Sequence, residues 1–135
     1  LAAEIIGALF GSLFVKYTIG NEANLGANAP NYAFQIPIIF GIEVLATALL
    51  MAVILTVVHT RGLRGFSGIV IGGIVGLDIF FLGIVSGASM NPARSLAPAL
   101  ISGGGPAFTN LWLYWTATFI GTSLIALIYR RKFIR

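Results

Sequence analysis

The chain has 135 residues, of which 58% are hydrophobic and 9% are charged, and its mean hydropathy is +0.98. These values lie outside the range of soluble domains and indicate a membrane protein. A net charge of +4 and a pI near 10.0 could suggest a nucleic-acid partner, but the basic residues lie beside apolar stretches, so we expect none. The absence of cysteine excludes disulfides and thiolate metal sites.

Four apolar stretches are long enough, or nearly long enough, to cross a bilayer. They cover residues 1–19, 34–58, 66–85 and 111–129. A fifth stretch, 92–101, would form a helix of about 15 Å, which is half of a hydrocarbon core. The sequence therefore predicts an all-α membrane protein with four transmembrane helices and one re-entrant half-helix.

Small residues recur at four-residue spacing in the first and third stretches. They are Gly7 with Gly11, and Gly68 with Gly72 and Gly76. This spacing lets helix backbones approach closely, so we expect these glycines at helix contacts within the bundle.

The basic residues predict the orientation of the chain. Six of the eight lie in two segments, Arg61 and Arg64 between the second and third spans, and Arg130, Arg131, Lys132 and Arg135 after the last span. By the positive-inside rule both segments are cytoplasmic, so the C-terminus is cytoplasmic and the half-helix enters from the outer face. Trp112, Tyr114 and Trp115 then begin the last span at the outer interface, where aromatic residues are enriched.

The half-helix begins with Asn91 and Pro92, a favoured N-cap followed by a residue that suits the first helical turn. Backbone exposed at membrane depth is tolerated only where protein covers it or where it lines a water-filled cavity, so this helix start indicates a pore. The Asn91 amide can donate to a passing water, while the positive end of the helix dipole orients that water and repels cations. Arg94 follows one turn later and can project into the outer vestibule.

With these residues the chain resembles the C-terminal half of an aquaporin, a major intrinsic protein. The stretch from Gly87 to Ser95, Gly-Ala-Ser-Met-Asn-Pro-Ala-Arg-Ser, is the family signature, and the order of the spans agrees with it. The resemblance implies a six-helix bundle of two inverted repeats, each with three spans and one Asn-Pro-Ala half-helix. We expect residues 1–135 to be one fragment of such a domain, containing only the second repeat, and the intact protein to be a homotetramer.

The resemblance also implies roles for individual residues. Asn91, Pro92 and Ala93 form the pore motif, Ile79, Ala88 and Arg94 form the selectivity filter, and the carbonyls of Gly87, Ala88, Ser89 and Met90 form a ladder of acceptors. Glu43 is a buried acid that braces the half-helix loop through backbone amides. Ser95, Ala99, Tyr114 and Trp115 occupy positions that fit water channels rather than glycerol facilitators.

Two acidic residues leave alternatives open. Asp78 stands where the resembling tonoplast-type pattern has Asn, and it could pair with Arg94 or face a neighbouring protomer. Glu4 stands at a position often occupied by Gln, so it is either protonated or near the cytoplasmic end of its span.

The predicted function is passive water conduction. The alternative is a facilitator for a small neutral solute such as ammonia, urea or glycerol, because the resemblance implies that Ile79 and Ala88 make the filter wide and apolar. A structural or adhesive membrane protein is the alternative from another class. No nucleophile, base and orienting group converge, so we expect no enzyme, and we expect no cofactor or metal.

The expected partners are the lipid bilayer, water and small neutral solutes. The expected location is the cell (plasma) membrane, as a multi-pass protein.

Overall fold

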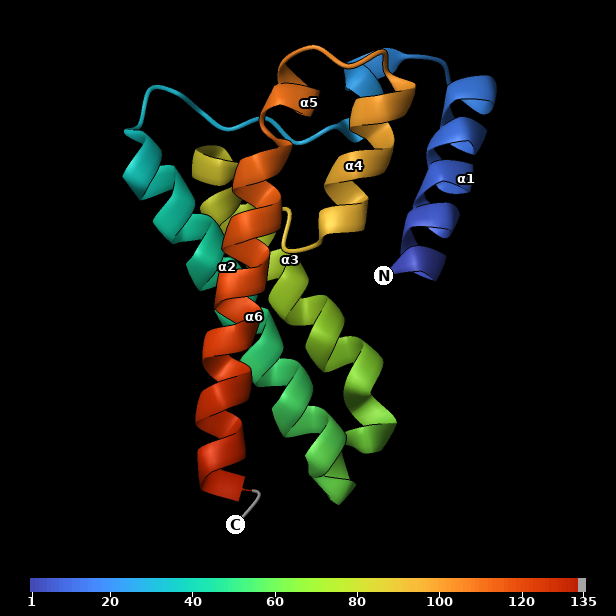
Figure 1. Cartoon of the computed structure of the whole chain (residues 1–135). Coiled ribbons are helices and arrows are strands. Elements are labelled where there is room, and N and C mark those ends of the chain that lie inside the picture. The colour runs from blue at the N-terminus through green and yellow to red at the C-terminus, as the bar shows by residue number, and fades with distance from the viewer. Residues whose placement is uncertain (134–135) are drawn as a thin grey trace.

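Helices account for nearly all of the fold, which a computed structural model describes for residues 1–133 (Figure 1). The helices are α1 (Ala2–Thr18), α2 (Ile36–His59), α3 (Ser67–Ser86), α4 (Pro92–Ile101), α5 (Pro106–Thr109) and α6 (Leu111–Phe133), with short 3-10 helices η1 (Glu22–Gly26) and η2 (Arg61–Phe66). The predicted all-α class is confirmed. Among the basic residues that are expected to be cytoplasmic, Arg135 and the side chains of Arg61, Arg64 and Lys132 lie outside the described part.

Within that part, three segments are long and apolar enough to cross a membrane, rather than the four expected. They are Ile36–His59, Ser67–Ser86 and Pro106–Arg131, the last combining α5 and α6. α1 has 17 residues, about 25 Å at the rise of an α-helix, which is somewhat less than a hydrocarbon core. α1 also begins at about the height at which α4 begins, so both helices lie in the upper half of the bundle in Figure 1.

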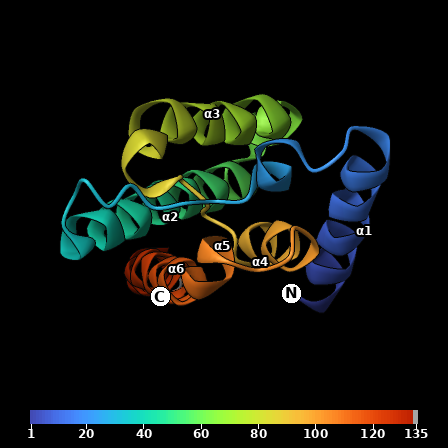
Figure 2. The same ribbon diagram turned by 90° about the horizontal axis from the view of Figure 1, so that it is seen from above.

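α2 is the centre of the three long helices, because it packs against both α3 and α6. The half-helix α4 starts at mid-height and rises to the loops at the top of Figure 1, with α6 on one side and α1 on the other (Figures 1 and 2). α1 contacts α4 and η1 but none of the three long helices. Three spans and a half-helix, the content of one repeat, therefore form one packed group, and α1 is an additional helix on its edge.

The glycine that is packed most tightly against another helix, among the glycines of the chain, is one that the spacing argument did not select. A methyl group on Gly121 of α6 would lie 2.6 Å from the carbonyl oxygen of Val44 and 3.0 Å from Cβ of Thr47, both in α2. The expected contacts at Gly7, Gly11, Gly68, Gly72 and Gly76 are not found, since a methyl group on any of them would meet no atom of the described chain within 4 Å. Four-residue spacing alone did not identify the packed face.

The aromatic residues at the start of α6 divide between surface and core. Trp112 is 52% exposed and its ring stacks on Phe40 of α2 at 6.4 Å, as suits an interfacial residue. Tyr114 is fully buried, so its expected place in an aromatic belt is wrong.

Candidate pore site

The loop between α3 and α4 is built from unusual backbone conformations. Gly87 ends α3 with φ of 86°, and Ala88 and Met90 follow with φ of 42° and 55°. Positive φ is uncommon and costly for residues other than glycine, so the surrounding structure must hold this loop in place. A side chain at Gly87 would also crowd its neighbours, since a methyl group there would lie 3.2 Å from the Tyr114 hydroxyl and 3.3 Å from the Ala29 carbonyl oxygen.

Glu43 supplies much of that support from α2. Its carboxylate is fully buried; Oε1 accepts from the Met90 amide at 2.6 Å and Oε2 accepts from the Ser86 hydroxyl at 2.8 Å. The Ser86 hydroxyl in turn accepts from the Ala88 amide at 3.1 Å. The two non-glycine residues of this loop that have positive φ, Ala88 and Met90, are therefore both hydrogen-bonded to one carboxylate, Met90 directly and Ala88 through Ser86. These hydrogen bonds offset their backbone strain.

Two of the four residues that were expected to indicate a water channel, Tyr114 and Ser95, also bond to the loop or to the end of α3 beside it. The Tyr114 hydroxyl donates to the Ser86 carbonyl oxygen at 2.7 Å, at the point where α3 ends. The Ser95 hydroxyl, in the first turn of α4, pairs with the hydroxyl of Ser89 in the loop. Ala99 is fully buried, and the half-buried Trp115 packs edge-on against Phe119 at 6.4 Å.

Asn91 caps α4 with its side-chain oxygen. Oδ1 accepts from the amides of Ala93 and Arg94 at 2.9 and 3.3 Å. The cap uses only the oxygen of the carboxamide, and Asn91 also lines a cavity. The N-cap and pore-lining interpretations of Asn91 are therefore compatible, since the cap leaves the amide nitrogen available as a donor.

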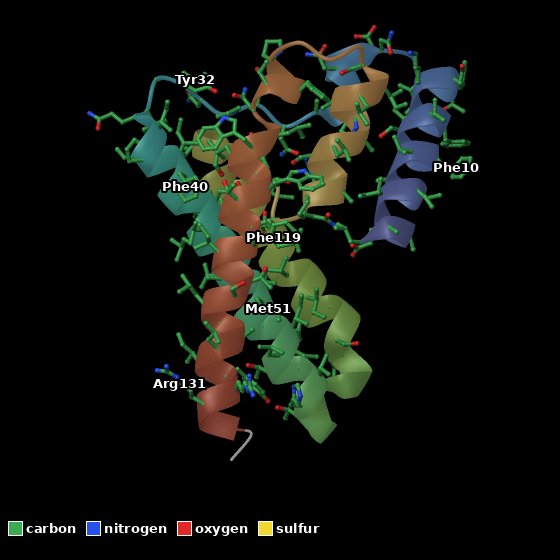
Figure 3. All side chains as sticks on the ribbon, in the orientation of Figure 1. Phe10, Tyr32, Phe40, Met51, Phe119 and Arg131 are labelled. Atoms are coloured by element: carbon green, nitrogen blue, oxygen red, sulfur yellow. The ribbon has the colours of Figure 1, made fainter. Side chains whose placement is uncertain are left out.

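A cavity of about 550 Å³ brings the predicted site residues together. It is lined by the three filter candidates Ile79, Ala88 and Arg94, by Ser89, Met90, Asn91 and Pro92 of the pore loop and motif, and by residues of α2 and α6 that include Leu50 and Phe119. Phe119 is labelled in Figure 3, at the height where α4 begins. Ala93 is 1% exposed and does not line this cavity, but it lines a second cavity together with Asn91 and Arg94.

The alternatives for two acidic residues were left open. Asp78 is 3% exposed, its Oδ2 has no hydrogen-bond partner, and within residues 1–133 no ion pair joins it to Arg94. Glu4 lies in the first turn of α1 and lines the cavity together with Asn91. The described residues contain no group of three His, Asp or Glu side chains that could hold a metal.

Asn28 is a residue of the site that sequence reasoning missed. It lies in the connector between α1 and α2, where its Nδ2 donates to the Gly87 carbonyl oxygen at 2.7 Å and its Oδ1 accepts from Ser95 and from the Arg94 guanidinium. One of the four expected pore carbonyls is thus bonded to the connector. Asn28 is one of several asparagines in this connector and has no periodicity to distinguish it, so no local signal could have found it.

Comparison with known proteins covers nearly the whole chain. A family model described as major intrinsic protein matches residues 1–129. Probable aquaporin TIP2-2 of Oryza sativa subsp. japonica is 34% identical over 131 residues, which are 95% of this chain and 50% of that protein. Probable aquaporin TIP3-2 of Arabidopsis thaliana is 35% identical over 136 residues, 98% of this chain and 49% of that protein.

A shorter match has a higher sequence identity. Aquaporin NIP3-1 of Arabidopsis thaliana is 51% identical over 83 residues, which are 61% of this chain and 25% of that protein. The chain spans about half the length of the curated relatives that it matches over most of its own length.

Proposed function

Since the chain belongs to the major intrinsic protein family, we propose that it forms one half of a passive water channel. The family is one of membrane channels rather than enzymes, and the chain is part of an integral, multi-pass membrane protein. The observation that carries the proposal is the cavity in which Asn91, Ala88 and Arg94 meet at the start of the half-helix.

The chemistry of this cavity suits water. The N-terminus of α4 presents a partial positive charge of about half an elementary charge, which orients water oxygens toward it and repels cations. The Asn91 amide nitrogen adds a donor at the same place, so a water bound there has its oxygen occupied and cannot relay a proton through it. Arg94 adds a full positive charge to the wall, which opposes protons and metal cations.

Small neutral solutes such as ammonia or urea are the second candidate. Ile79 and Ala88 line the cavity with one aliphatic and one small side chain, and neither offers a hydrogen bond. A filter with two such walls is wide and apolar, and it penalises a neutral solute less than a charged one. No observation favours the structural or adhesive alternative.

Stopped-flow light scattering on proteoliposomes of the complete protein tests both candidates. We expect water efflux faster than in empty vesicles, measurable urea or ammonia uptake, and no ion conductance. Ile79→His should suppress solute uptake more than water efflux, because it adds bulk and a polar group to the filter. Ile84→His is the matched control, since Ile84 is 70% exposed on the same helix and does not line the cavity.

Either of two results would decide against these assignments. Shrinkage no faster than that of empty vesicles would exclude a water channel. Equal loss of water and solute permeability in Ile79→His, or the same loss in Ile84→His, would exclude Ile79 from the filter.

The same family membership suggests how the chain is assembled. A second cavity of about 510 Å³ lies between α1 and α4 and shares Asn91, Arg94 and Glu4 with the first, so the start of the half-helix is open on two sides. Polar backbone open in this way is costly in lipid, and a second half-helix would cover it. Residues 1–135 alone should therefore conduct no water; robust flux that Asn91→Ala abolishes would contradict this.

We place the C-terminus in the cytoplasm, on the clustering of basic residues at that end, and we infer a homotetramer for the complete protein. A single cysteine added after residue 133 tests the orientation. If the C-terminus is cytoplasmic, an impermeant maleimide should label this cysteine only when it is applied from the cytoplasmic side. Location in the plasma membrane stays a prediction.

A further inference from the structure

A third cavity, of about 360 Å³, lies between α2 and α6, toward the lower ends of these helices in Figure 1. None of the residues that line it lines either of the two cavities at the start of the half-helix. We propose that this third cavity binds an anionic phospholipid, with the lipid phosphate at its polar end and part of an acyl chain in its apolar end. The site lies at the end of the bundle that is proposed above to be cytoplasmic.

The third cavity faces away from the proposed pore. Leu50 and Ile54 of α2 line the cavity that contains Asn91. Ala52 and Thr56, which line the third cavity, each follow one of these residues by two positions, about 200° around an α-helix. The third cavity therefore lies on the outer side of α2, where a membrane protein meets lipid or a neighbouring subunit.

The lining of the third cavity changes from apolar to polar toward the ends of the two helices. Ala52 stands two turns, about 10 Å, before His59, and Ile125 stands one turn before Tyr129. Thr60, the C-cap residue of α2, lines the cavity beyond His59. A phospholipid has the same order, because its acyl chains point to the middle of the bilayer and its phosphate lies at the surface.

The His59 ring is oriented so that one of its nitrogens remains for a ligand. Nδ1 lies 2.8 Å from the Leu55 carbonyl oxygen, and because a carbonyl oxygen only accepts, Nδ1 carries a hydrogen. The ring also contacts the ring of Tyr129, with centroids 4.9 Å apart, which holds the end of α2 against α6. Nε2 is the remaining nitrogen, and in the charged imidazolium it donates to an acceptor such as a phosphate oxygen.

The charge at this end of the chain suits an anion. Residues 60–66 and 129–135 contain six of the eight basic residues of the sequence and none of its four acidic residues. Arg131, which is labelled near the lower end of α6 in Figure 3, is one of them. Basic clusters beside transmembrane helices attract anionic lipids, so a cavity at this place meets a raised local concentration of them.

A second copy of the chain suits the third cavity less well than a lipid does. Copies of one membrane protein share one orientation, so a neighbouring copy would present its own basic end at the same depth. Like charges placed side by side oppose association, whereas a lipid phosphate neutralises them. The charge therefore favours lipid as the occupant.

Photocrosslinking of the complete protein in phosphatidylcholine vesicles tests the site. The vesicles contain a small fraction of phosphatidylglycerol with a diazirine near its headgroup, and mass spectrometry identifies the crosslinked peptides. We expect the crosslinks to concentrate in peptides that contain residues 52–60 and 125–129. Unlabelled phosphatidylglycerol should compete for them. Additional phosphatidylcholine should not, because it has no net charge, and inorganic phosphate should not, because it has no acyl chain.

One pair of variants tests the polar end of the cavity. His59→Phe keeps a ring against Tyr129 but removes both nitrogens, so crosslinking should fall about threefold to tenfold, the factor for one hydrogen bond. Lys16→Gln is the control, because it removes one positive charge from α1, which contacts neither α2 nor α6. It should keep the crosslinking within about twofold of that of the unchanged protein.

A second pair tests the apolar end and decides the matter if His59→Phe fails to insert. Ile128→Trp adds bulk to the cavity wall and should reduce crosslinking about threefold or more. Leu127→Trp adds the same bulk to the same helix and should leave crosslinking unchanged, because Leu127 does not line the cavity. The two residues are similarly exposed, 60% for Ile128 and 58% for Leu127.

Three results would overturn the proposal. Crosslinks spread evenly over all lipid-facing peptides would show that the cavity selects no lipid, as would equal effects of Ile128→Trp and Leu127→Trp. Competition by inorganic phosphate as effective as that by phosphatidylglycerol would show that the ligand is a free anion. Disulfide formation between copies of an Ile128→Cys variant, without lipid crosslinks at the cavity, would show that a neighbouring subunit occupies it. Since no readout requires water conduction, these results are independent of the proposed channel.

Discussion

The half-helix α4 and its loop are held differently on their two sides. On the side of α2, α3 and α6, buried polar groups bond the loop at several points, through Glu43, Ser86 and Tyr114. On the other side α1 has no buried residue, and a cavity of about 510 Å³ separates part of it from α4. One hydrogen bond crosses from the α1 side chains to α4, from Nζ of Lys16 to the Ile101 carbonyl oxygen at 3.1 Å.

The two sides of α4 differ in how strained the backbone is that they contact. The loop contains strained residues, Ala88 and Met90, which keep their conformation only if their amides have fixed partners. α4 itself contains no residue with positive φ, so it needs fewer fixed partners than the loop, although Pro98 removes one backbone donor from its middle. The pore loop is therefore organised by one packed group of three spans, and α1 contributes little to its geometry.

The largest expected effect comes from breaking the strongly held side. Glu43→Leu leaves the Met90 amide and the Ser86 hydroxyl without their acceptor in a buried place, at about 1–3 kcal/mol for each unpaired group. We therefore expect a loss of about 2–6 kcal/mol in the free energy of unfolding and loss of water permeability. Thermal unfolding in detergent, followed by circular dichroism, measures the first, and stopped-flow scattering measures the second.

Glu43→Gln is the control for shape. It keeps an oxygen that accepts from the Met90 amide, and its Nε2–H can donate to the Ser86 hydroxyl, although the hydrogen of that hydroxyl then loses its acceptor. Because one of the two acceptors is kept, Glu43→Gln should cost less than Glu43→Leu. Equal losses in the two variants would show that the negative charge, and not the pair of hydrogen bonds, holds the loop.

Sequence reasoning was most informative where the signal is local. Asn91 and Pro92 mark a helix start and a Gly-rich segment marks its end, and α4 runs from Pro92 to Ile101, the residues proposed for the half-helix. The partners of Glu43 lie 43 and 47 positions along the chain, so no spacing rule could name them. Asn28 was missed for the same reason, because its partners are 59 to 67 positions away.

A smaller effect is expected from a substitution at the close contact between α6 and α2, at Gly121. Gly121→Ala would place Cβ 2.6 Å from the Val44 carbonyl oxygen, an atom of the backbone that cannot rotate away. α2 and α6 must then move apart, and overpacking of this kind costs about 1–3 kcal/mol. The same thermal unfolding assay should show a lowered midpoint.

Gly72→Ala is the control, because a methyl group there meets no described atom within 4 Å. Its midpoint should stay at or above that of the unchanged protein, since alanine favours the helix over glycine. If Gly72→Ala is the more damaging of the two, a partner outside residues 1–133 packs on α3, and the expectation from four-residue spacing was right for the complete protein. Spacing identifies a surface that backbones can approach, but only tertiary structure shows which surface is used.

The smallest effect is expected on the α1 side. Lys16→Met keeps the length of the side chain but removes the hydrogen bond to the Ile101 carbonyl and the positive charge near the C-terminus of α4. One such bond contributes about 0.5–1.5 kcal/mol, so the unfolding midpoint should fall less than in Gly121→Ala. Hydrogen exchange of the peptide containing residues 96–104 should increase, because the last turn of α4 loses its tie to α1.

Lys16→Arg keeps a donor and a positive charge and should restore both measurements. A loss in Lys16→Met as large as that in Glu43→Leu would contradict the contrast between the two sides, because it would show that α1 carries as much of the half-helix as α2 does. A small fall in the unfolding midpoint, with increased hydrogen exchange only at the C-terminal end of α4, would support the contrast between the two sides. The loop at the N-terminal end of α4, bonded to Glu43 and Asn28, would then keep its geometry while the C-terminal end of α4 loosens.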